Sequence, residues 1–317
     1  MTWHWPDGLR GGLCALPALP FAFLDPSLGL AWALGTLPVA MLPLAPTRHA
    51  RRRLIGIGAV LGASVIAGSL FALTGITTVI GIFLTAYGSA VAASRAPGGL
   101  FALTLCLPVA AIGLSYPPGE ACALGVVFLA SAAFSYIALL AWPEFPTKPS
   151  RPQPLLPKPF ARRYGLLAGL AGATSALAGL AVHTDHLGWA PAAGYFVLRP
   201  SADMQRLRST GRIISVACGA TAGVVFVRTT PSATAIGVCA VLAVAGAAAT
   251  RTSHWYVGPA FGSLLCLTLL LYADPSTANE QWRLNQRIGM TAVGVASAYL
   301  YGVLVPRLIE RARTAHV

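Results

Sequence analysis

The chain repeats its own sequence pattern at a constant spacing of 157 residues. Trp32 and Pro43 in the first half correspond to Trp189 and Pro200 in the second half. Each pair is followed by a basic cluster and by a segment of small apolar residues. Because a duplicated segment folds in the same way twice, this pattern predicts two copies of one helical bundle.

The composition indicates a membrane protein. Of the residues, 56% are hydrophobic and only 10% are charged, and the mean hydropathy is +0.69. A soluble domain cannot bury that much apolar surface. A transmembrane helix needs about 20 apolar residues, and the apolar segments of this chain that we expect to be helices are roughly 10–24, 27–45, 54–73, 75–94, 97–115, 120–142, 165–183, 187–199, 210–228, 232–250, 255–272 and 287–305.

We therefore predict an all-α fold, a polytopic helical bundle of about 12 transmembrane helices in two parallel six-helix repeats. Residues 1–142 form the first repeat and 165–317 the second repeat with a short cytoplasmic tail. The segment 143–164 between them is rich in proline, which favours extended backbone, and we expect a cytoplasmic linker there. The apolar run near 11–24 lacks the flanks of a cleavable signal peptide, so we interpret it as the first helix.

The basic residues indicate the orientation in the membrane. With both termini in the cytoplasm, nineteen of the 22 Lys and Arg residues fall in inside loops, and only Arg228, Arg283 and Arg287 fall outside. Cytoplasmic loops of membrane proteins carry this excess of Lys and Arg. The net charge of +13 is thus a topology signal and not a sign of nucleic-acid binding. We predict a multi-pass protein of the bacterial inner membrane.

The sequence shows no catalytic or metal site. It has neither a Gly-x-Ser-x-Gly nor a His-Glu-x-x-His motif, and no pair of carboxylates lies inside the apolar segments. His183, Asp185 and His186 form a compact polar turn, but three ligands on one turn are few for a metal, and we expect a turn or a proton-sensitive gate. We therefore predict neither an enzyme nor a cofactor.

Arginines near helix ends suit an anionic substrate. Arg208 and Arg212 lie four residues apart and share one helix face, whereas Arg199 ends one segment and Arg287 begins another. Arginine binds carboxylates through two parallel hydrogen bonds, and helix N-termini add positive charge. Aromatic side chains at suitable depth either stack on a planar substrate ring or serve as core and membrane-interface residues; they are Trp189, Tyr195, Phe196, Tyr256 and Tyr299.

Several of these residues resemble the fusaric-acid-resistance-like family of membrane transporters, which includes the aromatic acid exporters. The resemblance covers about 185–307 and rests on Trp189-Ala, Val197-Leu198-Arg199-Pro200, Arg212, Gly219 with Gly223, Arg287-x-x-x-Thr291-x-x-Gly294 and Pro306-Arg307. The first half departs from the pattern, because Ile55 stands where Arg212 stands in the second half. Ser215 also replaces an expected glycine, and the soluble domains typical of the family are absent from this sequence.

The resemblance implies an exporter of small organic, aromatic carboxylate anions that the proton gradient drives. Duplicated bundles are also the usual architecture of transporters. The substrate-binding residues predicted here are Arg212, Arg208, Arg199, Arg287, Trp189, Thr291 and Tyr195. The alternatives are a passive organic-anion channel, like the distantly related aluminium-activated malate channels, and a non-transport membrane subunit or scaffold. We expect membrane lipid, a second copy of the chain or an accessory periplasmic subunit as partners.

Overall fold

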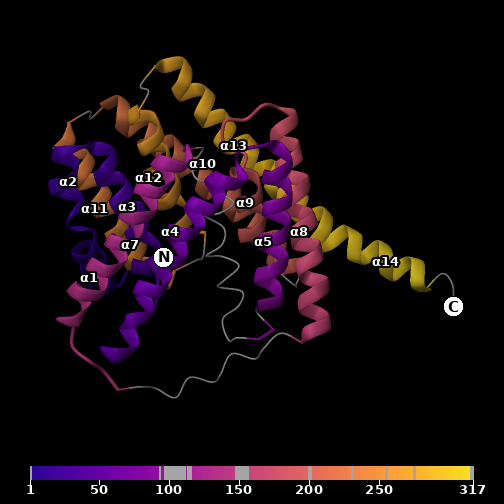
Figure 1. Cartoon of the computed structure of the whole chain (residues 1–317), viewed down its shortest axis with the longest axis horizontal. Coiled ribbons are helices and arrows are strands. Elements are labelled where there is room, and N and C mark those ends of the chain that lie inside the picture. The colour runs from indigo at the N-terminus through magenta and orange to yellow at the C-terminus, as the bar shows by residue number, and fades with distance from the viewer. Residues whose placement is uncertain are drawn as a thin grey trace. The chain divides into compact units, whose positions relative to one another are not determined.

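The computed structural model describes residues 2–92, 94–95, 112, 116–146, 157–198, 202–229, 232–253, 256–273 and 276–314. The regular structure in this part of the chain is entirely helical (Figure 1). The elements are α1 (Trp5–Ala15), α2 (Ala18–Leu24), α3 (Pro26–Ala40), η1 (His49–Arg52), α4 (Arg53–Phe71), α5 (Gly75–Ala92), α7 (Pro118–Leu140), α8 (Lys158–Ala181), α9 (Trp189–Val197), α10 (Ala202–Thr229), α11 (Ala233–Ala249), α12 (Gly258–Ala273), α13 (Thr277–Tyr299), the π-helical turn η3 (Leu300–Leu304) and α14 (Val305–Thr314). The all-α prediction is confirmed.

The prediction of about twelve transmembrane helices is wrong in number. Six helices of the described residues are long and apolar enough to cross a membrane, namely His49–Phe71, Gly75–Ala92, Pro118–Leu140, Lys158–Ala181, Asp203–Thr229 and Asn279–Ile309. Three further apolar helices are shorter: Pro26–Ala40, Ala233–Ala249 and Gly258–Tyr272. The chain is a multi-pass membrane protein with fewer full-length spans than its apolar segments predict. The predicted helix 97–115 lies outside the described residues, apart from Ile112.

Prolines account for two of the missing spans. The predicted helix 10–24 is divided into α1 and α2 at Pro17, whose ring removes a backbone donor and blocks the preceding turn. The predicted helix 187–199 is reduced to α9, whose nine residues rise only about 14 Å, half of a hydrocarbon core of about 30 Å. Leu198 ends α9 with φ of −55° and ψ of 122°, which is not helical, two residues before Pro200 in the sequence.

The described chain divides into two compact units, and each unit takes helices from both halves of the sequence. Unit 1 consists of 1–63, 122–150 and 214–288, and unit 2 consists of 64–121, 151–213 and 289–317. Helices α4, α7, α10 and α13 each contribute one part to either unit. Within the segment 143–164, for which we predict a linker, residues 147–156 lie outside the described residues and 158–164 form the beginning of α8.

In unit 1, α1, α2 and α3 pack around α11 (Figure 1, where the indigo α2 lies beside the orange α11). Glycines allow this contact, because a Cβ on Gly8 would stand 3.1 Å from the Cβ of Ala249, and one on Gly11 would stand 2.6 Å from that of Ala248. Such small residues let membrane helices approach closely. Asp25 begins α3, and its side chain accepts a hydrogen bond from the Ser27 N–H at 2.8 Å.

Two arginines of unit 1 bind the ends of helices. Arg51 is fully buried (0% exposed), and its guanidinium donates to four carbonyl oxygens, those of Ala45, Leu139, Trp142 and Pro143. Leu139 lies in the last turn of α7, and Trp142 and Pro143 follow just after that helix ends at Leu140. Arg10 does the same at the end of α3, donating to the carbonyl oxygens of Ala40 and Leu42. Both arginines therefore stabilise the fold directly.

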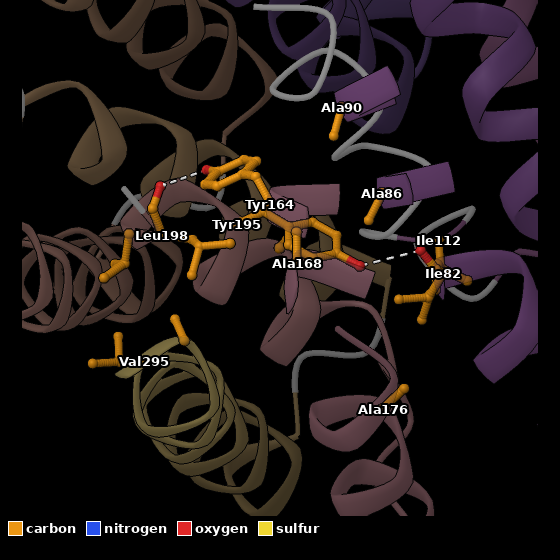
Figure 2. Close-up of a cluster of buried hydrophobic side chains, with 13 residues drawn as sticks. Ile82, Ala86, Ala90, Ile112, Tyr164, Ala168, Ala176, Tyr195, Leu198 and Val295 are labelled. Atoms are coloured by element: carbon orange, nitrogen blue, oxygen red, sulfur yellow. Dashed lines mark hydrogen bonds between the residues drawn. The ribbon is translucent and has the colours of Figure 1, made fainter. Parts of the chain in front are cut away.

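In unit 2, α5 packs along α8. This contact also runs over glycines, since a Cβ on Gly165 would stand 2.9 Å from the Cβ of Ala90. The apolar core of the unit gathers side chains of α5, α8, α9 and α13 (Figure 2). Two tyrosine side chains lie in this core, and each hydroxyl has a hydrogen-bond acceptor. Tyr195 donates to the carbonyl oxygen of Ile82 at 3.2 Å, and Tyr164 donates to that of Leu198 at 3.1 Å.

Candidate functional site

Arg212 lies in the interior of unit 2 and touches an aromatic ring. It is placed by α10, which begins with polar residues and becomes apolar towards its C-terminal half. Only 6% of Arg212 is exposed, and its guanidinium carbon stands 4.5 Å from the centre of the Phe196 ring on α9. A cation over a ring face is attracted by the negative charge of that face, and the attraction grows where water is excluded. This pair places one positive charge inside an apolar unit.

A close backbone approach fixes the position of α9. A Cβ on Gly294 of α13 would overlap the carbonyl oxygen of Ala190, and one on Gly194 would stand 2.8 Å from the carbonyl oxygen of Gly294. Both glycines are needed because any side chain there would separate the two helices. Since Phe196 lies two residues after Gly194 on α9, this contact also fixes the ring under Arg212.

Of the other predicted site residues in unit 2, two aromatic ones lie in the core. Trp189 is 1% exposed, and its ring centre stands 4.3 Å from that of His186. Tyr195 lies in the apolar cluster with its hydroxyl bound to the Ile82 carbonyl oxygen (Figure 2). Their arrangement is that of packing residues, which is one of the two interpretations that the sequence leaves open.

The remaining predicted residues of this unit have different environments. Arg208 is half-buried one turn before Arg212 on α10, and Thr291 on α13 is buried. Arg199 lies outside the described residues. The structure thus brings Arg212 and the α9 aromatics into one unit, with Arg208 on the adjoining turn of α10.

Arg287 belongs to unit 1 and has a separate set of neighbours there. Its Nη2 donates to the hydroxyl of Ser263 on α12 at 3.5 Å. Seven residues earlier on α13, Glu280 accepts a hydrogen bond from Arg228 Nε of α10 at 2.5 Å, and this carboxylate is almost fully buried. The three arginines predicted to face the outside, Arg228, Arg283 and Arg287, are therefore all in unit 1.

Two features of unit 2 were not anticipated from the sequence. Gln205 on α10 is fully buried, and its Nε2 donates to the carbonyl oxygen of Ala298 at 2.6 Å, close before the π-helical turn η3. Gly302 in that turn leaves room for the Gln205 amide. π-Helical turns occur often at functional sites. In the sequence, the burial of Gln205 is indicated only by its lack of charge beside the basic residues 206–212, which is a weak signal.

The residues that the structure describes contain no group of three or more His, Cys, Asp or Glu side chains able to hold a metal ion. The polar turn at 183–186 instead packs its second histidine on Trp189, as described above. His183 adopts a left-handed backbone conformation with φ of 53°, which is typical of a tight turn.

No match to this chain was found among curated proteins or among solved structures. A family model does match, and its span runs from the second half of α8 to η3 and includes Arg212, Phe196 and Arg287. Residues 173–301 match the model of the fusaric acid resistance protein-like family, so this multi-pass membrane protein carries a domain of that family.

Proposed function

We propose that this protein is a transporter that exports small organic, aromatic carboxylate anions across the bacterial inner membrane, with the proton gradient as driving force. The fusaric acid resistance protein-like domain supports transport as the general activity. Under this proposal the protein catalyses no reaction and needs no cofactor. Membrane lipid, a second copy or a periplasmic subunit are the partners that we expect.

The observation that carries the proposal is the Arg212–Phe196 pair. A charged side chain within an apolar membrane unit is expensive to maintain, and such residues generally mark the path of a substrate or ion. Arginine has five N–H donors, so contact of the guanidinium with a ring does not exhaust its capacity for a carboxylate. The Phe196 ring beside the guanidinium offers an apolar surface for the aromatic part of the same substrate.

The internal repeat belongs to the proposal, and the helix packing supports it. At the spacing of 157 residues, Gly8 of α1 corresponds to Gly165 of α8, and α5 corresponds to α11 within one residue. In unit 1 the first glycine packs on α11, and in unit 2 the second packs on α5. In unit 1, α1 of the first repeat thus packs on α11 of the second, and in unit 2, α8 of the second repeat packs on α5 of the first. Two equivalent repeats are expected to make such equivalent contacts with each other.

Further helix ends follow the same spacing. Helix α3 ends at Ala40 and α9 ends at Val197, which are 157 residues apart, and the ends of α4 at Phe71 and of α10 at Thr229 differ from this spacing by one residue. We propose parallel repeats related by an axis along the membrane normal, with both termini in the cytoplasm. The bias of basic residues supports this orientation.

The experiment that tests the proposal measures flux through the purified protein alone. The protein is reconstituted into liposomes, and uptake of radiolabelled 4-hydroxybenzoate is followed with and without an imposed pH gradient. Protein-free liposomes correct for diffusion of the neutral acid through the lipid. Radiolabelled malate serves as the aliphatic comparison.

Each result separates the alternatives. Accumulation above the external concentration only in the presence of a pH gradient, with little malate uptake, supports a proton-driven exporter of aromatic acids. Uptake that stops when the internal and external concentrations are equal, both with and without the pH gradient, identifies a passive anion channel. The absence of protein-dependent flux for both probes, in protein that is monodisperse in detergent, overturns the proposal in favour of a non-transport subunit.

A further inference from the structure

Glu280 is a buried carboxylate at the beginning of a helix that is long enough to span the membrane. It lies in the first turn of α13 and is 3% exposed. Among the side chains that the structure describes, it is the one Asp or Glu that is buried. An ionised carboxylate away from water costs free energy unless hydrogen bonds or an opposite charge compensate it. Buried ionisable residues of membrane proteins are rare, and many of them belong to proton and ion pathways.

Arg228 of α10 supplies the opposite charge through a single hydrogen bond. Its Nε donates to Glu280 Oε2 at 2.5 Å. The strongest arginine–carboxylate pairs have two parallel bonds, but here the second oxygen, Oε1, accepts no hydrogen bond from the residues that the structure describes. The pair is also asymmetric, because the Arg228 side chain is 49% exposed and that of Glu280 only 4%. The arginine therefore keeps contact with water, which the carboxylate has lost.

The pair joins the ends of two helices within unit 1. Arg228 lies in the last turn of α10, and Glu280 lies in the first turn of α13. A helix carries partial negative charge at its C-terminal end and partial positive charge at its N-terminal end, so each side chain also interacts favourably with its own helix. Neutralisation of Glu280 removes both the ion pair and the interaction with α13. The connection between the two helix ends thus depends on one ionisation.

The helices packed around the pair carry other titratable groups, which determine when the carboxylate is ionised. On α13, Arg283 follows Glu280 by one turn and Arg287 follows it by two turns. Helix α12 packs against both α10 and α13. Its described residues carry no charged side chain, and its titratable ones are Cys266 and Tyr272. Basic groups favour the ionised carboxylate, so we expect the pair to be closed until the proton concentration rises.

We infer that Glu280 is a proton-binding site and that its protonation separates the ends of α10 and α13. The proton comes from water, binds Oε1 and leaves a neutral carboxylic acid. The ion pair is then lost, whereas Arg228 keeps its charge and turns to water from its half-exposed position. An ion pair that has given up its hydration gains little net free energy, so the closed and open arrangements differ little in stability.

This site deepens the proposed function, because it names a group on which the proton gradient acts. In the proposed orientation these ends of α10 and α13 lie on the outer side of the membrane, from which protons enter. The role of the site in transport rests on the proposed function. The proton binding and the helix movement do not, so they are measured without substrate.

The test measures the distance between spin labels on α10 and α13 in the full-length protein in nanodiscs. Cysteines for the labels replace Val225 and Gln281, which are both exposed, in a chain whose six native cysteines are removed. Double electron–electron resonance gives the distance distribution in mildly alkaline and in mildly acidic buffer. We expect acid to lengthen the mean distance by at least about 2 Å, which is the size of a small helix shift.

Two glutamate substitutions identify the group that binds the proton. Glu280→Gln removes the charge but keeps an acceptor for Arg228, so we expect a folded protein with the longer distance in both buffers. Glu120→Gln is the matched control, because Glu120 also lies in the first turn of a helix, α7, but is exposed. It should keep the full response of the parent protein. Infrared difference spectra between the two buffers should show a protonated carboxyl band that Glu280→Gln lacks.

Two outcomes overturn the inference. The first is a distance in the parent protein that does not change with pH. The second is a Glu280→Gln protein that responds to acid as the parent does, or that keeps the shorter distance in both buffers. Absence of flux in the liposome assay with an intact acid response would overturn the proposed function and leave the proton site standing. Accumulation driven by the pH gradient in a protein without the acid response would do the reverse.

Discussion

The guanidinium carbon of Arg212 stands 4.5 Å from the centre of the Phe196 ring, and 16 residues of sequence separate the two. The contact joins α10 to the short helix α9 within unit 2. Arg212 is thus placed in the interior. Arg206 on the same helix is exposed, and its Nη2 stands 3.5 Å from the Tyr299 hydroxyl. The two arginines form a matched pair for experiment.

Arg212→Gln should abolish most transport of 4-hydroxybenzoate, whereas Arg206→Gln should leave it nearly intact. A carboxylate without its arginine in a partly desolvated path loses about 1.5–3 kcal/mol, or roughly 10- to 100-fold in rate. Arg212→Lys should restore only part of the flux, because a point charge lacks the planar fork of donors. Initial uptake rates at equal amounts of inserted protein measure the effect. Equal rates for the Arg206 and Arg212 variants would make Arg212 a packing or topology residue.

Gly294→Ala should destabilise the protein, whereas Gly289→Ala should not. A methyl group on Gly294 overlaps the carbonyl oxygen of Ala190 and separates α9 from α13, and overpacking of this kind costs about 1–3 kcal/mol or more. A Cβ on Gly289 meets nothing within 4 Å, and alanine there stabilises the helix by roughly 0.5–1 kcal/mol. Thermal unfolding in detergent compares the two variants with the parent protein. Equal unfolding temperatures would show that the close approach is not required.

The sequence predicts the membrane class well, because that depends on local composition, whereas the helix bounds differ: the segments predicted at 165–183 and 287–305 begin at Lys158 and Thr277. The spacing of 157 residues relates the end of α3 at Ala40 to that of α9 at Val197, although α9 begins late. The number of spans was overestimated because hydropathy treats an apolar run as continuous, whereas Pro17 divides α1 from α2.

The environments of single side chains could not be predicted, because they depend on contacts between distant segments. Arg51 and Arg52 are adjacent and identical in type, yet one is fully buried and the other is exposed. The sequence leaves open whether Trp189 and Tyr195 stack on a substrate ring or pack in the core, and the structure shows both side chains buried in unit 2. The buried position of Gln286 could not be predicted either, because a single glutamine forms no sequence pattern. Only the structure shows that its amide is buried without a hydrogen-bond partner among the described residues.

A cysteine-labelling experiment tests the orientation. Single cysteines replace Ser150, which lies outside the described residues, or the exposed Ser276 before α13, in a chain whose six native cysteines are removed. Because the basic residues place 143–164 in the cytoplasm, an impermeant maleimide added to intact cells should label position 276 and not position 150. Permeabilised cells, in which both positions should react, are the control. Labelling of position 150 alone would invert the orientation.

Arg51→Met should destabilise unit 1 severely, while Arg52→Met should have little effect. Arg51 donates to the carbonyl oxygens of Ala45, Leu139, Trp142 and Pro143, and methionine removes all four of these hydrogen bonds to buried or partly buried acceptors. The expected cost is on the order of 3 kcal/mol, as for other buried charged networks that lose one partner. Arg51→Lys should recover only part of the stability, because an ammonium cannot reach acceptors on several sides as the guanidinium fork does.

Both methionine variants remove one positive charge from the same loop, so a residue that acts only through the charge bias would give two equal effects. The yield of monodisperse protein and its unfolding temperature in detergent distinguish these results, and equal values for Arg51→Met and Arg52→Met would show that the helix-end contacts of Arg51 contribute nothing to folding.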